Sequence, residues 1–138
     1  MCAGVFVTAC MKASKQLSDK HYTIVSIEAE VSPGFKGKHF PVLAPPSDLV
    51  QAKQQGVIST PVFNLLFHKY LKTLDAVQII RSLRRLSPEY DLVALVCDSH
   101  FKSDSYRSIV AKWLTENDFP TEEVVVNYLK GVKQKLLF

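Results

Sequence analysis

The chain of 138 residues lacks several features that would assign it to a class of protein at once. It has no apolar run of the roughly 18 residues that a membrane-spanning helix requires, so we expect no membrane span. Its three cysteines, Cys2, Cys10 and Cys97, are an odd number at unrelated spacings, which argues against a disulfide framework. The start of the chain has neither the early Lys or Arg nor the long apolar run of a signal peptide. These absences predict a cytoplasmic protein.

Motifs of the common catalytic and cofactor sites are missing as well. The sequence contains no P-loop, no dinucleotide-binding glycine fingerprint and no Ser-His-Asp order. Its four histidines lack metal-ligand spacing with one another or with cysteine (His21, His39, His68 and His100). We therefore expect neither a metal ion nor a bound cofactor.

The composition is that of an ordinary globular protein. Hydrophobic residues make up 47% of the chain and charged residues 22%. The length suits one domain with a real core. Lys and Arg number 17 against 13 Asp and Glu, which gives a net charge of +4. This surplus modestly favours anionic partners such as nucleotides or nucleic acid, although many plain soluble domains share it.

Hydrophobic patterning predicts alternating strands and helices. Val5–Ala9 and Tyr22–Glu28 are short and rich in β-branched or aromatic residues, so we expect strands there. Leu92–Cys97, five consecutive apolar residues and then a cysteine, is the strongest strand prediction. Two glycines and four prolines between Val31 and Pro46 leave little room for regular structure. Residues 12–20 are expected to form a loop or one helical turn.

Three helices are predicted between the second and third of these strands. Proline near the first turn and Gly56 as a stop place one at about 46–55. The next begins after Ser59 or Thr60 and ends near Lys72, with aromatic side chains on its apolar face that suit a core better than base stacking. Asp75 is the expected N-cap of the third helix, which ends at Pro88.

A further helix should begin near Ser103 or Asp104. Residues 121–138 favour a helical extension, and a short edge strand before this helix is the second option. The whole pattern predicts a single α/β domain over residues 1–138. Its sheet should be small and mostly parallel, with helices packed on it in two or three layers, as in Rossmann-like folds.

Cys97 and Arg107 mark the expected site. Ligands of open α/β sheets bind beyond the carboxyl ends of the strands, where a loop leads into a helix N-terminus. Backbone amides there attract anions, and an arginine adds a bidentate clamp. We therefore predict an anion-binding pocket at the end of Leu92–Cys97. Its predicted contacts are Arg107, Ser103, Ser105, Lys36 and Lys38, with Cys97 as a candidate catalytic thiol.

A structural role for the same residues is the alternative. Cys97 is then a small buried residue, and Arg107 pairs with Asp98 or Asp104. The loop has no glycine to let the backbone approach a phosphate closely, and its two aspartates would repel one. Nine residues separate the cysteine from the arginine, which is longer than in cysteine-dependent phosphatase loops.

Three segments carry a resemblance to a known family. They are Pro-Gly-Phe-Lys-Gly at 33–37 with Leu-Ala-Pro at 43–45, Leu-Asp at 74–75, and Leu-Val-Ala-Leu-Val-Cys at 92–97 with Arg107 and Ile-Val-Ala-Lys-Trp-Leu at 109–114. On these segments the chain resembles the "domain of unknown function 488" family of bacteria and bacteriophages, over about residues 5–124. The family has Cys-His-Arg where this chain has Ser105, Tyr106 and Arg107. The resemblance implies a site at Cys97 and Arg107 that has lost the family's Cys-His pair.

The resemblance implies a protein of a bacterial cell or a phage-infected host. The strand-loop-helix pattern and the basic charge balance predict that it binds an anionic ligand, a nucleotide or nucleic acid, near Cys97 and Arg107. Catalysis is expected to be degenerate or missing. Two alternatives stay open. One is a cysteine-dependent enzyme that acts on a nucleotide or nucleic acid, with Cys97 as its nucleophile. The other is an interaction protein, such as a phage-encoded inhibitor of a host factor.

Overall fold

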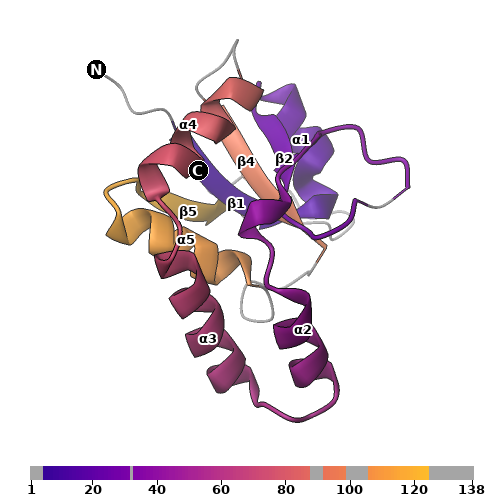
Figure 1. Ribbon diagram of the computed structural model, residues 1–138. Coiled ribbons are helices and arrows are strands. Elements are labelled where there is room, and N and C mark those ends of the chain that lie inside the picture. Colours follow the sequence, from indigo (N-terminus) through magenta and orange to yellow (C-terminus); the bar gives the residue numbers. More distant parts are fainter. Residues whose placement is uncertain (1–4, 32, 88–91, 99–105, 125–138) are drawn as a thin grey trace.

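Five parallel strands form one sheet in the order β3-β2-β4-β1-β5 (Figure 1). The computed structural model describes residues 5–31, 33–87, 92–98 and 106–124. The strands are β1 (Val5–Cys10), β2 (Thr23–Ser26), β3 (Lys38–His39), β4 (Leu92–Cys97) and β5 (Thr121–Val124). The predicted α/β class is confirmed, and every strand pair is parallel.

The two longest strands lie next to each other in the middle of this sheet. β1 and β4 pair in continuous register from Val5 opposite Leu92 to Cys10 opposite Cys97. Their near-continuous apolar sequences suit strands that are covered on both faces. Residues 93–97 of β4 are all buried, as are residues 6–10 of β1.

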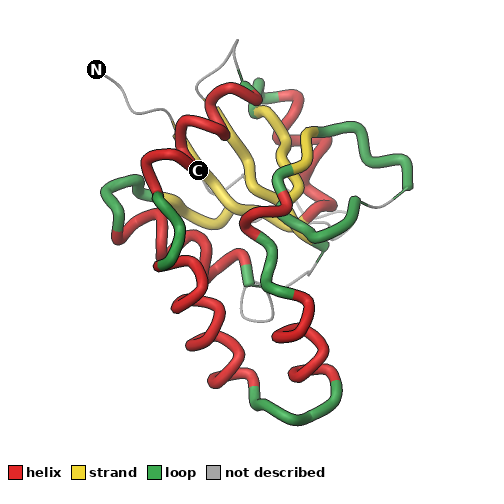
Figure 2. Tube along the Cα trace, viewed as in Figure 1, coloured by secondary structure: helices red, strands yellow, loops and turns green. Residues whose placement is uncertain are grey.

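Helices connect the strands and surround them (Figure 2). Two short 3-10 turns, η1 and η2, precede α1 and α2. The bounds are η1 (Met11–Ala13), α1 (Ser14–Asp19), η2 (Pro41–Leu43), α2 (Ser47–Gln54), α3 (Thr60–Lys72), α4 (Ala76–Leu86) and α5 (Arg107–Glu116). Asp75 is confirmed as the N-cap of α4, because its side chain accepts hydrogen bonds from the backbone N–H groups of Val77 and Gln78.

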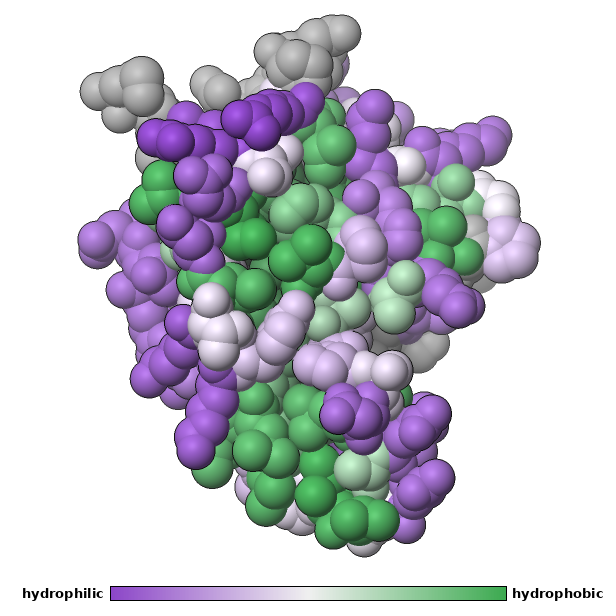
Figure 3. Space-filling view, in the orientation of Figure 1, coloured by the Kyte–Doolittle hydropathy of each residue, from purple (hydrophilic) through white to green (hydrophobic). Residues whose placement is uncertain are grey.

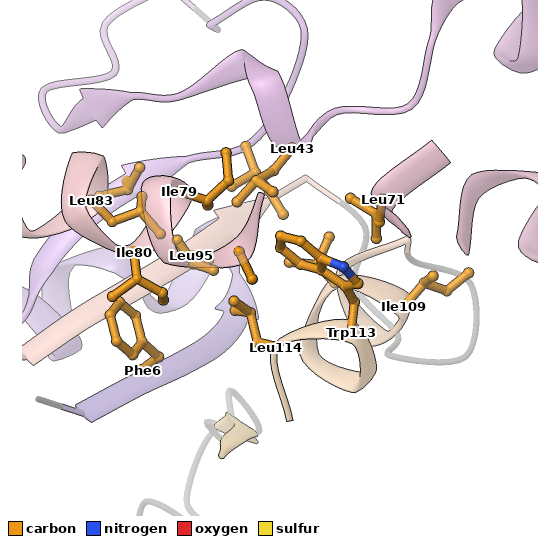
Figure 4. Packing of buried hydrophobic residues seen from close by; sticks show 14 of the residues in the cluster. Phe6, Leu43, Leu71, Ile79, Ile80, Leu83, Leu95, Ile109, Trp113 and Leu114 are labelled. Atoms are coloured by element: carbon orange, nitrogen blue, oxygen red, sulfur yellow. The ribbon is translucent and has the colours of Figure 1, made fainter. Parts of the chain in front are cut away.

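The helices form two layers, one on each face of the sheet. On one face Ala13 and Leu17, from η1 and α1, pack against Val7 and Ala9 of β1. The other face carries the larger core, in which Phe6 and Leu95 meet side chains of α3, α4 and α5 (Figure 4). Of the two predicted arrangements, the structure therefore has the three-layer one.

Several boundaries differ from the predictions. Of the loop or helical turn expected at residues 12–20, the structure has the helical option, extended over residues 11–19, because Leu17 is completely buried and anchors α1 on the sheet. The connection rich in proline and glycine contains β3, a two-residue edge strand on β2. Thr121–Val124 is the edge strand that was the alternative for the start of the tail. The rest of the predicted tail helix lies outside the described residues.

The α2–α3 hairpin extends away from the sheet (Figure 1). In the view of Figure 3, hydrophobic side chains gather over this part of the molecule. Val57, between α2 and α3, and Leu65 of α3 are 71% and 57% exposed. Within the described part of the chain, none of the helices has the length and apolar character to cross a membrane.

Candidate functional site

The carboxyl ends of β1 and β4 are the topological switch point of the sheet. The chain leaves β1 into α1, on one face, and returns from β4 through α5, on the opposite face. β1 and β4 are neighbours, and in open α/β sheets such a switch point is where ligands bind. Cys10 and Cys97 are the last residues of the two strands.

A buried ion pair lies directly beneath this strand end. Arg107 is fully buried at the first residue of α5, and its Nη2 lies 2.9 Å from Oε2 of Glu123. Its Nε donates to both oxygens of the same carboxylate, at 3.0 and 2.9 Å. Thr8 of β1 donates its hydroxyl proton to Oε1 of Glu123 at 2.7 Å. These bonds join α5, β5 and β1 in one polar cluster.

Cys97 belongs to the same cluster. Nη1 of Arg107 donates a hydrogen bond to Sγ of Cys97 at 3.4 Å. Burial disfavours the charged guanidinium, but hydrogen bonds to Glu123 and Cys97 and the charges of both partners outweigh it and raise the pKa of Arg107. Arg107 is therefore a permanent cation held between an acid and a thiol.

Tyr106 and Glu28 lie on the β2 side of this cluster. The Tyr106 hydroxyl donates to the carbonyl oxygen of Ile27 at 3.1 Å. Burial, followed by the charges of Cys97 and Glu28, raises the pKa of Tyr106 far above its ordinary value, and Arg107 offsets only part of this. The phenol therefore stays protonated at neutral pH and acts as a donor.

Glu28 follows β2 and faces Asp98, which follows β4. Burial and the charge of Asp98 raise the pKa of the Glu28 carboxyl, while the backbone N–H of Asp98 and the imidazole of His39 lower it in part. Its Oε1 is buried and has no hydrogen-bond partner among the described residues. His39 is also bonded to the Glu28 main chain, with Nε2 at 2.7 Å from the carbonyl oxygen.

A cleft of about 650 Å³ opens on the α1 side of the sheet. It runs from Met11, directly after β1, along Lys15 and Ser18 of α1 to Lys36 of the loop before β3 and Lys38, the first residue of β3. Three lysines and one aspartate, Asp19, are its charged lining residues, so the cleft is positively charged. Tyr22 and Phe35 add aromatic surface.

The loop that forms one wall of the cleft is packed tightly against β2. A Cβ atom on Gly37 would lie 2.6 Å from the carbonyl oxygen of Ile24, closer than such atoms approach. Gly34 has φ +84°, a conformation that glycine adopts without strain. The two glycines thus let the loop turn and hold Lys36 and Lys38 beside α1.

The structure divides the predicted site residues between two places. Cys97 and Arg107 are in contact on the α5 side of the sheet, where the acid paired with Arg107 is Glu123. Lys36 and Lys38 line the cleft on the α1 side. Ser103 and Ser105 lie outside the described residues. No group of three or more His, Cys, Asp and Glu side chains is placed to hold a metal ion in the described ranges.

Several residues of these sites were not predicted from the sequence, among them Cys10, Glu28, Glu123 and Lys15. None belongs to a local motif. Strand order brings Cys10 and Glu123 to the Cys97–Arg107 contact, because β1 pairs with both β4 and β5. Glu28 follows β2, the other neighbour of β4, and Lys15 is carried by α1.

Comparisons with protein-family models, curated proteins and solved structures give no match for this chain. Its resemblance to the family of unknown function stays a prediction.

Proposed function

We propose that the protein binds a phosphate-bearing ligand, a nucleotide or a nucleic acid strand, in the lysine-lined cleft. The observation that carries this proposal is the convergence of Lys15, Lys36 and Lys38 on one cleft that has a single acid in its lining. Ammonium groups on separate elements can surround a phosphate from different directions. The volume of the cleft is in the range of small-molecule sites.

Aromatic side chains in the same cleft favour a ligand with a base. Tyr22 and Phe35 lie among the lysines and are only partly buried. Base stacking on an aromatic ring contributes about 1–3 kcal/mol per base. A nucleotide can thus place its phosphate at the lysines and its base on these rings.

Arg107 has a different part in this proposal from the one predicted from the sequence. Its guanidinium is already ion-paired with Glu123 inside the protein, which makes it a poor clamp for an incoming anion. Through the contact with Cys97 it instead fixes the start of α5 at the switch point. The cleft begins at Met11, next to the same strand end.

The test is a calorimetric titration of the full chain with mononucleotides and, separately, with short single-stranded DNA, repeated at several salt concentrations. We expect the Lys36→Ala, Lys38→Ala double variant to bind more weakly. The slope of the logarithm of its binding constant against the logarithm of the salt concentration should become shallower by about one unit for each phosphate that the protein no longer neutralises. The matched control is Lys69→Ala, Lys72→Ala, which removes the same charge from exposed positions of α3.

Three results would contradict the proposal: no binding to any of these anions, equal weakening by the two double variants, or a salt dependence that the cleft variant leaves unchanged. Comparison of the mononucleotide and single-stranded DNA titrations distinguishes a nucleotide site from a site that binds a nucleic acid strand. If no anion binds, the two alternative classes remain, namely an interaction protein and a cysteine-dependent enzyme.

A further inference from the structure

Cys10 and Cys97 are opposite each other at the switch point. They are Cα register partners, the last pair in the β1–β4 ladder. Side chains of register partners in parallel strands lie on the same face of the sheet. That face is the one covered by α5, because Cys97 packs in the core with Phe6, Leu95 and Trp113. Both residues are buried thiols.

The separation of neighbouring strands allows the two cysteines to be joined. Paired Cα atoms of adjacent strands lie about 5 Å apart, and disulfide-linked Cα atoms usually lie about 4.4–6.8 Å apart. The Cβ atoms need to approach more closely than the regular strand spacing, to about 3.8 Å. A disulfide here therefore carries strain, and strained disulfides are easily reduced.

Arg107 lies beside the sulfur of Cys97. Its Nη1 donates to Sγ of Cys97, and a cation next to a sulfur favours reaction of that sulfur as a nucleophile. Glu123 holds the guanidinium from its other side, and Thr8 in turn bonds the Glu123 carboxylate. We therefore assign the attack to Cys97, and Cys10 is in the position of a second thiol that can react with it.

Burial selects the oxidant. Cys97 is 1% exposed and Cys10 is 7% exposed. A bulky disulfide such as oxidised glutathione cannot place its sulfur against either residue without displacing the strand ends. A small hydroperoxide needs much less room.

We propose that Cys97 and Cys10 are a peroxide-reactive dithiol, in which Cys97 attacks a small hydroperoxide and Cys10 resolves the product into a reversible disulfide. The Cys97 thiol gives up its proton, and its sulfur attacks one oxygen of hydrogen peroxide. An S–O bond forms, the O–O bond breaks, and the hydroxide that leaves takes a proton to become water.

The Cys10 thiol then attacks the sulfenic sulfur of Cys97. An S–S bond forms, the S–O bond breaks, and the hydroxide that leaves takes the Cys10 proton. In total two thiols and one peroxide give one disulfide and two waters. An external thiol returns the pair to its starting state by exchange.

The experiment uses the full chain with Cys2→Ser, so that Cys10 and Cys97 are its remaining thiols. The protein is treated with hydrogen peroxide, alkylated, digested and analysed by mass spectrometry. We expect a peptide pair joined through Cys10 and Cys97 that dithiothreitol separates. Oxidised glutathione should give much less of it.

Variants separate the two roles. With Cys10→Ser we expect the crosslink to be lost and Cys97 to be trapped by dimedone as the sulfenic acid, then oxidised further to the sulfinic acid. With Cys97→Ser, Cys10 should stay a thiol at the same peroxide dose. Thermal unfolding of each variant shows that it is folded.

Two outcomes would overturn the inference. One is a peroxide-treated protein in which both cysteines remain thiols. The other is oxidation of Cys97 to the sulfinic acid at the same rate with and without Cys10. Neither measurement requires a nucleotide or the lysine cleft, so the result is independent of the proposed anion binding.

Discussion

The carboxylate of Glu123 and the guanidinium of Arg107 form an ion pair in which the arginine side chain has no exposed surface and the glutamate side chain only 7%. Three N–O distances of about 3 Å connect them, and the Thr8 hydroxyl bonds the same carboxylate. Both charges are buried away from water, so removing either one would leave the other buried without a counter-charge.

Glu123→Gln should destabilise the protein severely. The substitution keeps the shape of the side chain but leaves the Arg107 cation buried without its counter-charge, which costs about 3–5 kcal/mol. Urea denaturation measures the free energy of unfolding. Glu122→Gln is the matched control, since this neighbour is exposed on the same strand, and its effect should stay within about 0.5 kcal/mol. Similar losses for the two variants would contradict the buried pair.

Glu28→Gln should change how stability depends on pH. The pKa of Glu28 is raised above its ordinary value of 4.5 in the folded protein, chiefly by burial. Between that value and the raised one, the folded state holds more protons than the unfolded state. Glu28 therefore lowers stability as the pH rises through this window.

The free energy of unfolding of Glu28→Gln, minus that of the natural chain, should increase from pH 4 towards neutrality and then level off. Glu30→Gln removes the same charge two residues away at an exposed position and serves as the control. A flat difference for Glu28→Gln, or the same slope for both variants, would show that Glu28 titrates as in the unfolded chain.

Leu71 and Leu65 of α3 allow a test of which face of this helix packs in the hydrophobic core. Leu71 is completely buried, whereas Leu65 is 57% exposed. Leu71→Ala should cost about 2–5 kcal/mol because it leaves a cavity. Leu65→Ala changes the helix propensity equally but should shift stability by only about 0.5 kcal/mol. The reverse ranking in thermal or urea unfolding would mean that α3 is rotated.

The N-cap of α4 is a local feature with a defined cost. Oδ1 of Asp75 accepts from the backbone N–H of Val77 at 3.0 Å and from that of Gln78 at 3.4 Å. Asp75→Ala should destabilise the protein by about 1 kcal/mol. Asp75→Asn retains the cap and should be nearly neutral in the same unfolding assay. Equal effects of the two variants would assign the loss to the charge instead.

Local patterns predicted the elements well. β4 and α3 lie where hydrophobic runs and proline positions indicated, and Asp75 caps α4 as expected. These features depend on neighbours within a few residues. β3 was missed because a two-residue edge strand has almost no pattern of its own.

The candidate sites depended on long-range pairings that local patterns do not contain. Arg107 was expected to pair with Asp98 or Asp104, close by in the sequence, but Glu123 reaches it because β5 lies next to β1. Lys36 and Lys38 were assigned to the same pocket as Arg107, whereas the crossing of the chain from one face of the sheet to the other separates them. In both cases strand order decided the outcome.

Strand order also constrains how the chain is made. β4 lies between β1 and β2, so these two early strands have no hydrogen bonds with each other. The first 91 residues can form helices during synthesis, but β1 and β2 must wait for Leu92–Cys97 before either has its central partner. Such long-range pairing is slow and leaves strand edges exposed to other chains in the meantime. The centre of the sheet therefore cannot be complete before β4 has left the ribosome.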